Sequence, residues 1–87
     1  MNIVENIPQL QWACRRGMLE LDLFLAPYLE EKYLDLALAD KMAFVELINY
    51  PDPEILSWLL GEAEPLNPSL INIVQAIRTH ARTRARF

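Results

Sequence analysis

Apolar residues recur every three or four positions along most of this chain, which is the spacing of one face of an α-helix. The pattern is clearest between residues 18 and 32, where the apolar positions are Met18, Leu21, Phe24, Leu25, Tyr28 and Leu29. No stretch alternates between apolar and polar residues for long enough to predict a strand, and β-branched residues are few and scattered. The periodicity therefore predicts an all-α protein.

The breaks in this pattern predict five helices, at residues 8–15, 18–32, 38–49, 52–60 and from 67 onward. Pro27 lies inside the second helix, where it removes one backbone hydrogen bond and is expected to kink the helix. The inward positions of the third and fifth helices are expected to be Phe44, Leu47 and Ile48, and Leu70, Ile73, Val74, Ile77 and Ala81. Because the connections are short, we expect a compact five-helix bundle with short loops.

Two helices carry recognisable end signals. Asp52 is expected to cap the fourth helix, with Pro53 at its first position, and Gly61 is expected to end it. Asn67 and Pro68 are expected to begin the fifth helix by the same logic.

The length of 87 residues, with 53% hydrophobic and 23% charged residues, fits a single folded domain over residues 1–87. Charge is unevenly placed. Residues 78–87 hold four arginines and no acid, whereas residues 1–77 hold four basic and twelve acidic residues, a net charge of −8. We expect residues 78–87 to form a solvated, flexible basic tail. The acidic body argues against a nucleic-acid-binding protein, which usually presents a broad basic face.

No apolar run approaches the roughly 20 residues that a membrane-spanning helix needs. The first residues lack the basic and apolar regions of a secretory signal, and they also lack the arginine- and serine-rich pattern of a transit peptide. A single cysteine excludes an internal disulfide and fits a reducing compartment. We therefore expect a complete cytoplasmic protein that does not insert into membranes.

The residues that usually carry catalysis or bind metals are scarce. Cys14 and His80 are the only cysteine and histidine, which are too few for a structural zinc site, and Cys14 is expected to be a half-buried residue of the first helix. The two glycines cannot form a glycine-rich phosphate loop, and the acid pairs at residues 20 and 22 and at residues 30 and 31 have the spacing of a solvated helix face. We expect no catalytic residues, no metal site and no enzymatic activity.

Arg15, Arg16 and Gly17 form an unusual group at the end of the first predicted helix. Gly17 fits the left-handed residue that ends many helices, and the arginines would then lie at the negative end of the helix dipole. The same residues suit a partner, because glycine lets another backbone approach and arginine offers five donors to a carboxylate or phosphate. Glu20, one turn into the next helix, is placed to orient Arg16 or to bind that partner. The residues alone leave both interpretations open.

The segment WACRRGMLELD, which contains an RGxxE motif, resembles the signature of the succinate dehydrogenase assembly factor family, SdhE, also called the flavinator family. The resemblance continues through FLAPYLEEKY and FVELINYPDPEILSWLLG, so it covers nearly the whole chain. The length and the five-helix prediction agree with bacterial members of this family.

The resemblance implies a non-enzymatic chaperone that binds the flavoprotein subunit of succinate dehydrogenase, and in some bacteria that of fumarate reductase. Such factors promote covalent attachment of FAD to a histidine of that subunit. The FAD belongs to the partner, so we expect no cofactor stably bound to this chain. Carried over by position, the partner-binding residues are those of the motif and those that flank it, namely Arg16, Gly17, Glu20, Arg15, Trp12 and Asp22.

Within this implied site, Arg16 is expected to pair with a partner carboxylate or to lie near the flavin phosphates, and Gly17 is expected to make the tightest contact. Trp58 is expected in the core, whereas Trp12 either belongs to the binding surface or packs under the Arg-Gly group. We expect a monomer. Two alternatives remain: an antitoxin-like regulatory protein, a label given to some family members, and a nucleic-acid binder that acts through the arginine tail.

Overall fold

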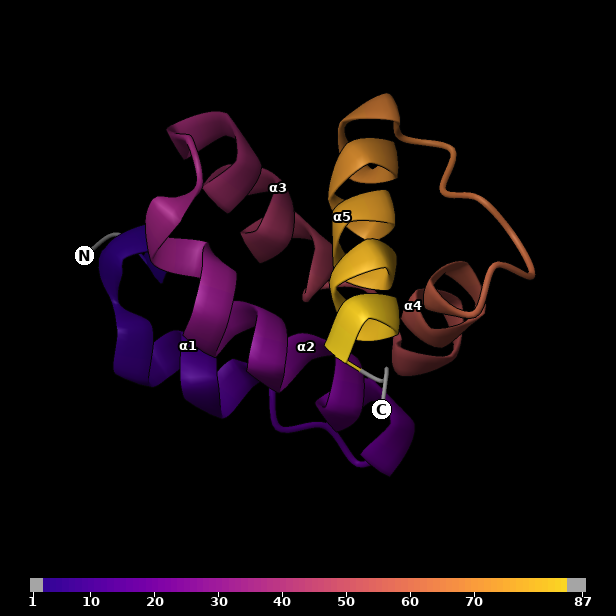
Figure 1. The fold of residues 1–87 in the computed structure, drawn as a ribbon, viewed down its shortest axis with the longest axis horizontal. Coiled ribbons are helices and arrows are strands. Elements are labelled where there is room, and N and C mark those ends of the chain that lie inside the picture. Colours follow the sequence, from indigo (N-terminus) through magenta and orange to yellow (C-terminus); the bar gives the residue numbers. More distant parts are fainter. Residues whose placement is uncertain (1–2, 85–87) are drawn as a thin grey trace.

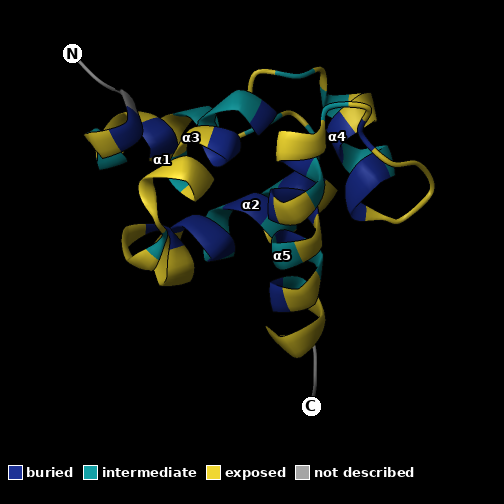
Figure 2. Cartoon of the chain, turned by 90° about the horizontal axis from the view of Figure 1, so that it is seen from above, coloured by how far each residue is buried: buried dark blue, intermediate teal, exposed yellow. Residues whose placement is uncertain are grey.

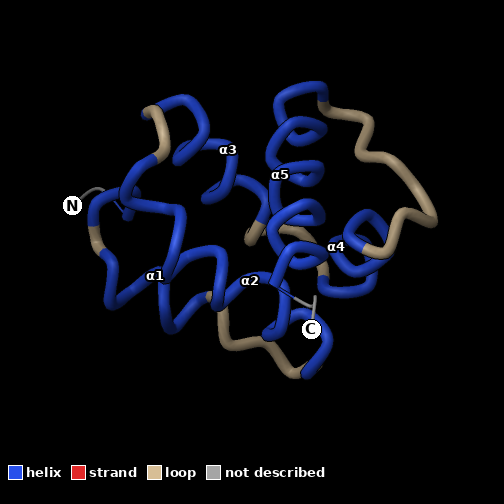
Figure 3. The backbone as a smooth tube through the Cα atoms, in the orientation of Figure 1, coloured by secondary structure: helices blue, strands red, loops and turns tan. Residues whose placement is uncertain are grey.

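The computed structural model describes residues 3–84, and this range consists of helices and loops only (Figures 1 and 3). Its five α-helices are α1 (Ile7–Ala13), α2 (Leu19–Lys32), α3 (Leu38–Leu47), α4 (Asp52–Leu59) and α5 (Pro68–Arg84). Two short 3-10 helices, η1 (Ile3–Glu5) and η2 (Tyr33–Asp35), precede α1 and follow α2. The prediction of an all-α five-helix bundle is confirmed, whereas the two 3-10 helices had no sequence signal.

Helix α5 is the central element of the bundle. It packs against α2, α3 and α4, and Figure 1 shows α3 and α4 on its two sides with α2 beneath. The buried faces of the helices turn toward one another, while the outer faces and the loop before α5 are exposed (Figure 2). The fully buried side chains are Leu10, Cys14, Leu21, Leu25, Tyr33, Phe44, Leu47, Ile55, Leu70, Val74 and Ile77.

The apolar periodicity of α2 predicted its buried face well. Leu21, Leu25, Tyr28 and Leu29 are buried, and the helix continues through Pro27 as a single element. The predicted inward residues of α3 and α5 are also buried, except that Ala81 is only half-buried, and Trp58 lies in the core as expected. Burial of these side chains supplies the main driving force for the fold, at about 25 cal/mol per Å² of apolar surface.

An aromatic cluster ties the N-terminal segment to the bundle. The ring of Phe44 lies 6.0 Å from that of Tyr28 and 5.4 Å from that of Tyr33, measured between centroids. The buried Tyr33 hydroxyl donates a hydrogen bond of 2.7 Å to the carbonyl of Val4 in η1. Because a buried hydroxyl needs such a partner, η1 and η2 are held together at this point.

The start of α4 differs from the prediction by one residue. Pro51 occupies the N-cap position and Asp52 is the first helical residue. None of the hydrogen bonds found within residues 3–84 joins the Asp52 carboxylate to a backbone N–H. The capping prediction for Asp52 is therefore wrong, because this carboxylate bonds to the side chain of Arg16 instead. At the start of α5 the prediction holds, since Asn67 Oδ1 accepts a hydrogen bond of 3.0 Å from the backbone N–H of Ser69.

The end of α4 is a Schellman-type turn at Gly61, which has a φ of 81°. The Gly61 N–H donates to the Trp58 carbonyl at 3.1 Å, and the Glu62 N–H donates to the Ser57 carbonyl at 2.9 Å. Gly61 thus occupies the left-handed position that the sequence predicted for it.

Replacing Gly61 with alanine is expected to lower the free energy of unfolding by about 1–2 kcal/mol, because an L side chain is strained at this positive φ. The added Cβ would also lie 3.0 Å from Nη2 of Arg78, which must shift. Urea unfolding followed by circular dichroism measures the change. Gly17→Ala is the matched control, and an equal loss of stability in both variants would contradict the prediction.

The predicted basic tail is helical as far as the structure describes it. Residues 78–84 form the last two turns of α5 rather than an irregular segment, and Thr79, Arg82, Thr83 and Arg84 are exposed to solvent as expected, while residues 85–87 lie outside the described residues. His80 is buried, with its ring edge-on to Tyr28 and its Nε2 2.9 Å from Oε1 of Glu31. The hydrogen bond with His80 and the nearby charge of Arg84 lower the pKa of the Glu31 carboxyl.

Candidate functional site

The Arg-Gly edge, defined here as residues 15–17, lies in the short connection between α1 and α2. On one side the Arg15 N–H donates to the Trp12 carbonyl at 3.1 Å, which continues the end of α1. On the other side the Leu21 N–H donates to the Met18 carbonyl at 3.1 Å, which forms the first turn of α2. The edge is therefore held between two helix ends.

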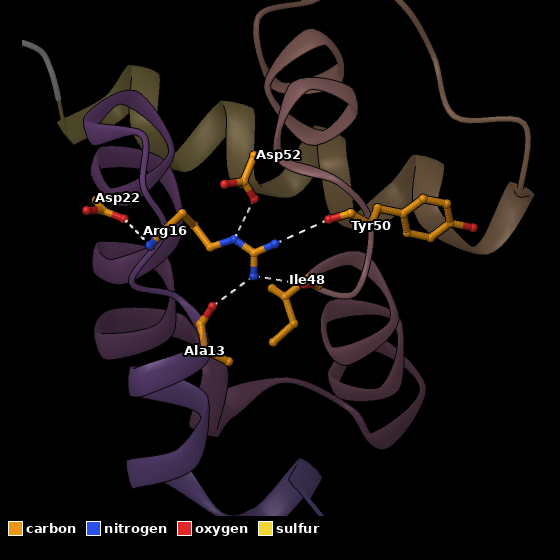
Figure 4. A network of polar contacts seen from close by, with 6 residues as sticks. All are labelled: Ala13, Arg16, Asp22, Ile48, Tyr50 and Asp52. Carbon is orange, nitrogen blue, oxygen red and sulfur yellow. Dashed lines mark hydrogen bonds and ion pairs between the residues drawn. The ribbon is translucent and has the colours of Figure 1, made fainter.

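The side chain of Arg16 turns inward from this edge and bonds to several separate segments (Figure 4). Its Nε donates to Oδ1 of Asp52 at 2.7 Å. Its Nη1 donates to the carbonyls of Ala13 and Ile48, both at 2.9 Å, and its Nη2 donates to the carbonyl of Tyr50 at 3.2 Å. The side chain is only 16% exposed. Arg16 thereby joins the end of α1 to the end of α3 and the start of α4.

This arrangement leaves the Arg16 guanidinium little capacity to bind a partner. An arginine side chain has five N–H donors, and the four bonds described use all but one of them. The expectation that Arg16 pairs with a partner carboxylate or flavin phosphates does not fit this geometry. Arg16 fixes the position of its neighbours instead.

Two aspartates, rather than Glu20, orient Arg16. Asp22 Oδ1 accepts a hydrogen bond of 2.9 Å from the backbone N–H of Arg16, while Asp52 holds the side chain. Among the described residues no hydrogen bond or ion pair links Glu20 to Arg16, so the orienting role suggested for Glu20 is not observed. The Glu20 side chain is exposed on the first turn of α2 and remains open to a partner.

Gly17 does not have the left-handed conformation that the sequence suggested, since its φ is not positive. Helix α1 already ends at Ala13, so Gly17 lies beyond the position that would terminate it. The residue is exposed, and a Cβ at this position would have no described heavy atom within 4 Å beyond its chain neighbours. The chain's own fold therefore does not require glycine here.

The remaining predicted site residues, Trp12 and Arg15, face solvent. Trp12 is 74% exposed, so the alternative in which it packs under the Arg-Gly edge is wrong. Arg15 is exposed as well. Sequence reasoning missed Leu19, which is a large exposed apolar residue at the start of α2. It also missed the role of Asp52, because 36 residues separate this acid from Arg16 and no local pattern links them.

The only cysteine and the only histidine of the chain, Cys14 and His80, are both buried. Cys14 is fully buried rather than half-buried, and this burial raises the pKa of its thiol to about 12, so the reactive thiolate is disfavoured at neutral pH. Across residues 3–84 no group of His, Cys, Asp and Glu side chains is arranged to hold a metal ion. In the same range no helix is long and apolar enough to cross a bilayer.

Comparison with known proteins gives the site its context. The profile of the Sdh5 family, described as "Flavinator of succinate dehydrogenase", matches residues 8–81. A protein of Serratia sp. named "FAD assembly factor SdhE" is 38% identical over 81 residues, which are 93% of this chain and 92% of that protein. A protein of Shewanella oneidensis with the same name is 41% identical over 76 residues, which are 87% of this chain and 93% of that protein. The chain therefore belongs to the family of succinate dehydrogenase flavinators.

Proposed function

We propose that this protein is an assembly factor that binds the flavoprotein subunit of succinate dehydrogenase and promotes covalent attachment of FAD to it. The observation that carries the proposal is the Arg-Gly edge, where an exposed glycine with open space around it is held in place by the Arg16 network. Such an edge can approach another backbone closely without first having to become ordered. The family match over residues 8–81 supports the identity of the partner.

The factor acts as a chaperone and not as an enzyme. The bond between FAD and the protein forms within the flavoprotein, so this chain needs to supply neither a nucleophile nor a base. The inert Cys14 thiol and the His80 ring, which is bonded to Glu31, are consistent with that role. FAD remains with the flavoprotein, and this chain acts in the cytoplasm as a monomer with no cofactor of its own. The fumarate reductase flavoprotein, which has the same chemistry, is the second partner that we propose.

Binding of the edge selects a conformer of the flavoprotein that is competent for flavin attachment. A partner that binds one conformer more tightly shifts the population toward it, by an amount set by the difference in affinity. Gly17 lies at the closest contact, and the exposed side chains of Trp12, Leu19 and Glu20 surround it. Exposed aromatic residues often dominate the energy of such contacts, so Trp12 is the expected anchor.

Covalent flavin on the flavoprotein subunit is expected to rise when this protein is present. The subunit is expressed with and without this protein, and flavin fluorescence is read in a denaturing gel, where only covalent flavin survives. A subunit whose acceptor histidine is replaced by alanine is the control and should stay dark in both conditions. Equal fluorescence with and without this protein would contradict the proposed function.

A further inference from the structure

A second surface feature lies beside the Arg-Gly edge and is lined by other residues. The C-terminal groove, as we name it, runs between α2, the end of α4 and the last turns of α5, and has a volume of about 660 Å³. In Figure 1 the C-terminal end of α5 lies over α2, and α5 contacts both α2 and α4. Its apolar lining consists of Leu23, Phe24, Pro27, Leu60 and Ala81.

Two residues of the apolar lining are open to solvent. Leu23 is 64% exposed and Leu60 is 52% exposed, although both are large apolar residues in a small domain. An apolar side chain from another molecule would find a place here.

The α5 side of the groove is basic, in contrast to the rest of the chain. Arg78, Arg82 and Arg84 line it, although residues 1–77 carry a net charge of −8. Arg84 already pairs with Glu31, and Arg78 lies 3.8 Å from Glu64. None of the hydrogen bonds and ion pairs found within residues 3–84 uses the guanidinium of Arg82. Arg78 and Arg82 lie one helical turn apart, so their charges repel each other. A carboxylate placed between them would relieve this repulsion.

We propose that the C-terminal groove binds an acidic segment of the flavoprotein subunit, with an apolar side chain against Leu23 and Phe24 and carboxylates on Arg82 and Arg78. This inference rests on the proposed function and adds a second contact to it. Charge complementarity selects the occupant, because the arginine side attracts carboxylates and the lining accepts apolar groups. Glu20, a motif residue, also lines the groove, so one partner can cover the edge and the groove together.

Site-specific photocrosslinking tests which molecule occupies the groove. A benzoylphenylalanine residue is placed at Leu23, and at Leu38 as the control, because Leu38 is similarly exposed at 61% but lies on α3. The flavoprotein subunit is the probe, and the crosslinked peptides are identified by mass spectrometry. We expect Leu23 to crosslink to a flavoprotein segment rich in aspartate or glutamate. Crosslinking to a second copy of this chain, to a segment without acids, or to nothing would overturn the proposal.

Affinity measurements test the charge contact. Arg82→Glu is expected to weaken binding of the flavoprotein subunit by roughly tenfold or more, since an attraction becomes a repulsion. Lys32→Glu, at an exposed lysine outside the groove lining, is the charge-matched control and should bind like the wild type. Replacing one acid of the crosslinked segment with lysine should restore the affinity of Arg82→Glu. Circular dichroism spectra verify that the variants are folded.

The results separate this inference from the proposed function. If the wild type neither binds the flavoprotein nor raises its covalent flavin, both proposals fail. If the wild type does both, and Arg82→Glu binds as tightly as the wild type, only the groove proposal fails. A loss of affinity in Arg82→Glu that the lysine replacement in the partner restores would support the groove as a direct contact.

Discussion

Replacing Arg16 with alanine is expected to lower the free energy of unfolding by about 2–4 kcal/mol, a large share of the stability of a domain of this size. The substitution leaves the Asp52 carboxylate and the carbonyls of Ala13, Ile48 and Tyr50 without their donors. In thermal unfolding the midpoint should fall by roughly 10–25 °C. Differential scanning calorimetry or circular dichroism gives the measurement.

The neighbouring arginine is the control for this result. Arg15 is exposed, so Arg15→Ala should change the free energy of unfolding by less than about 0.5 kcal/mol. A double-mutant cycle of Arg16→Ala with Asp52→Ala should give a coupling energy of about 1–2 kcal/mol, because the two side chains share a bond of 2.7 Å. Similar stabilities of the Arg15 and Arg16 variants would show that the Arg16 network does not support the fold.

This result bears on how the RGxxE motif is interpreted. Arg16 is the motif residue most deeply engaged inside the chain, whereas Gly17 and Glu20 face solvent. An Arg16 variant that fails to support flavin attachment would therefore not show that the guanidinium touches the partner. The failure would follow from loss of the geometry that presents Gly17. Activity of Arg16 variants has to be measured at a temperature at which they are still folded.

The sequence predicted those parts of the fold that depend on neighbours along the chain. The buried face of α2 followed from a period of three and four residues, and the end of α4 followed from Gly61 and its short-range hydrogen bonds. The basic tail shows where this reasoning fails. The run of arginines suggested a flexible segment, but Ile77 and His80 are buried against the bundle and residues 78–84 are helical. Tertiary packing outweighs local composition there.

The motif gave the position of the candidate site along the chain, but not the part that each of its residues plays in the fold. The exposure of Gly17 and Glu20 agrees with this position. The inward direction of Arg16 depends on Ile48, Tyr50 and Asp52, which lie 32 to 36 residues away and contribute two backbone carbonyls and one carboxylate. Backbone carbonyls carry no residue identity, so no sequence pattern could reveal them. The prediction that Gly17 ends α1 was wrong for a different reason. It depended on where α1 ends, and the helix ends at Ala13, earlier than the sequence predicted.

Substitution at Gly17 should separate function from folding more cleanly than any other change in the motif. Because the space around Gly17 is open and its φ is not positive, Gly17→Ala should leave stability unchanged or raise it by about 0.4–1 kcal/mol. Gly17→Arg should also fold, since its side chain can extend into solvent. Thermal unfolding and circular dichroism spectra measure both effects.

If Gly17 makes the closest contact with the flavoprotein, Gly17→Arg should weaken binding of that subunit by at least about tenfold, a penalty of about 1.4 kcal/mol, and covalent flavin on the subunit should fall. Gly17→Ala, with a single added methyl group, should lose less, so the loss should grow with side-chain size while stability stays constant. Ala37→Arg, which adds the same side chain at an exposed position before α3, should retain full function. A folded Gly17→Arg variant that supports wild-type levels of covalent flavin would remove the Arg-Gly edge from the interface, because an arginine cannot fit where two backbones meet.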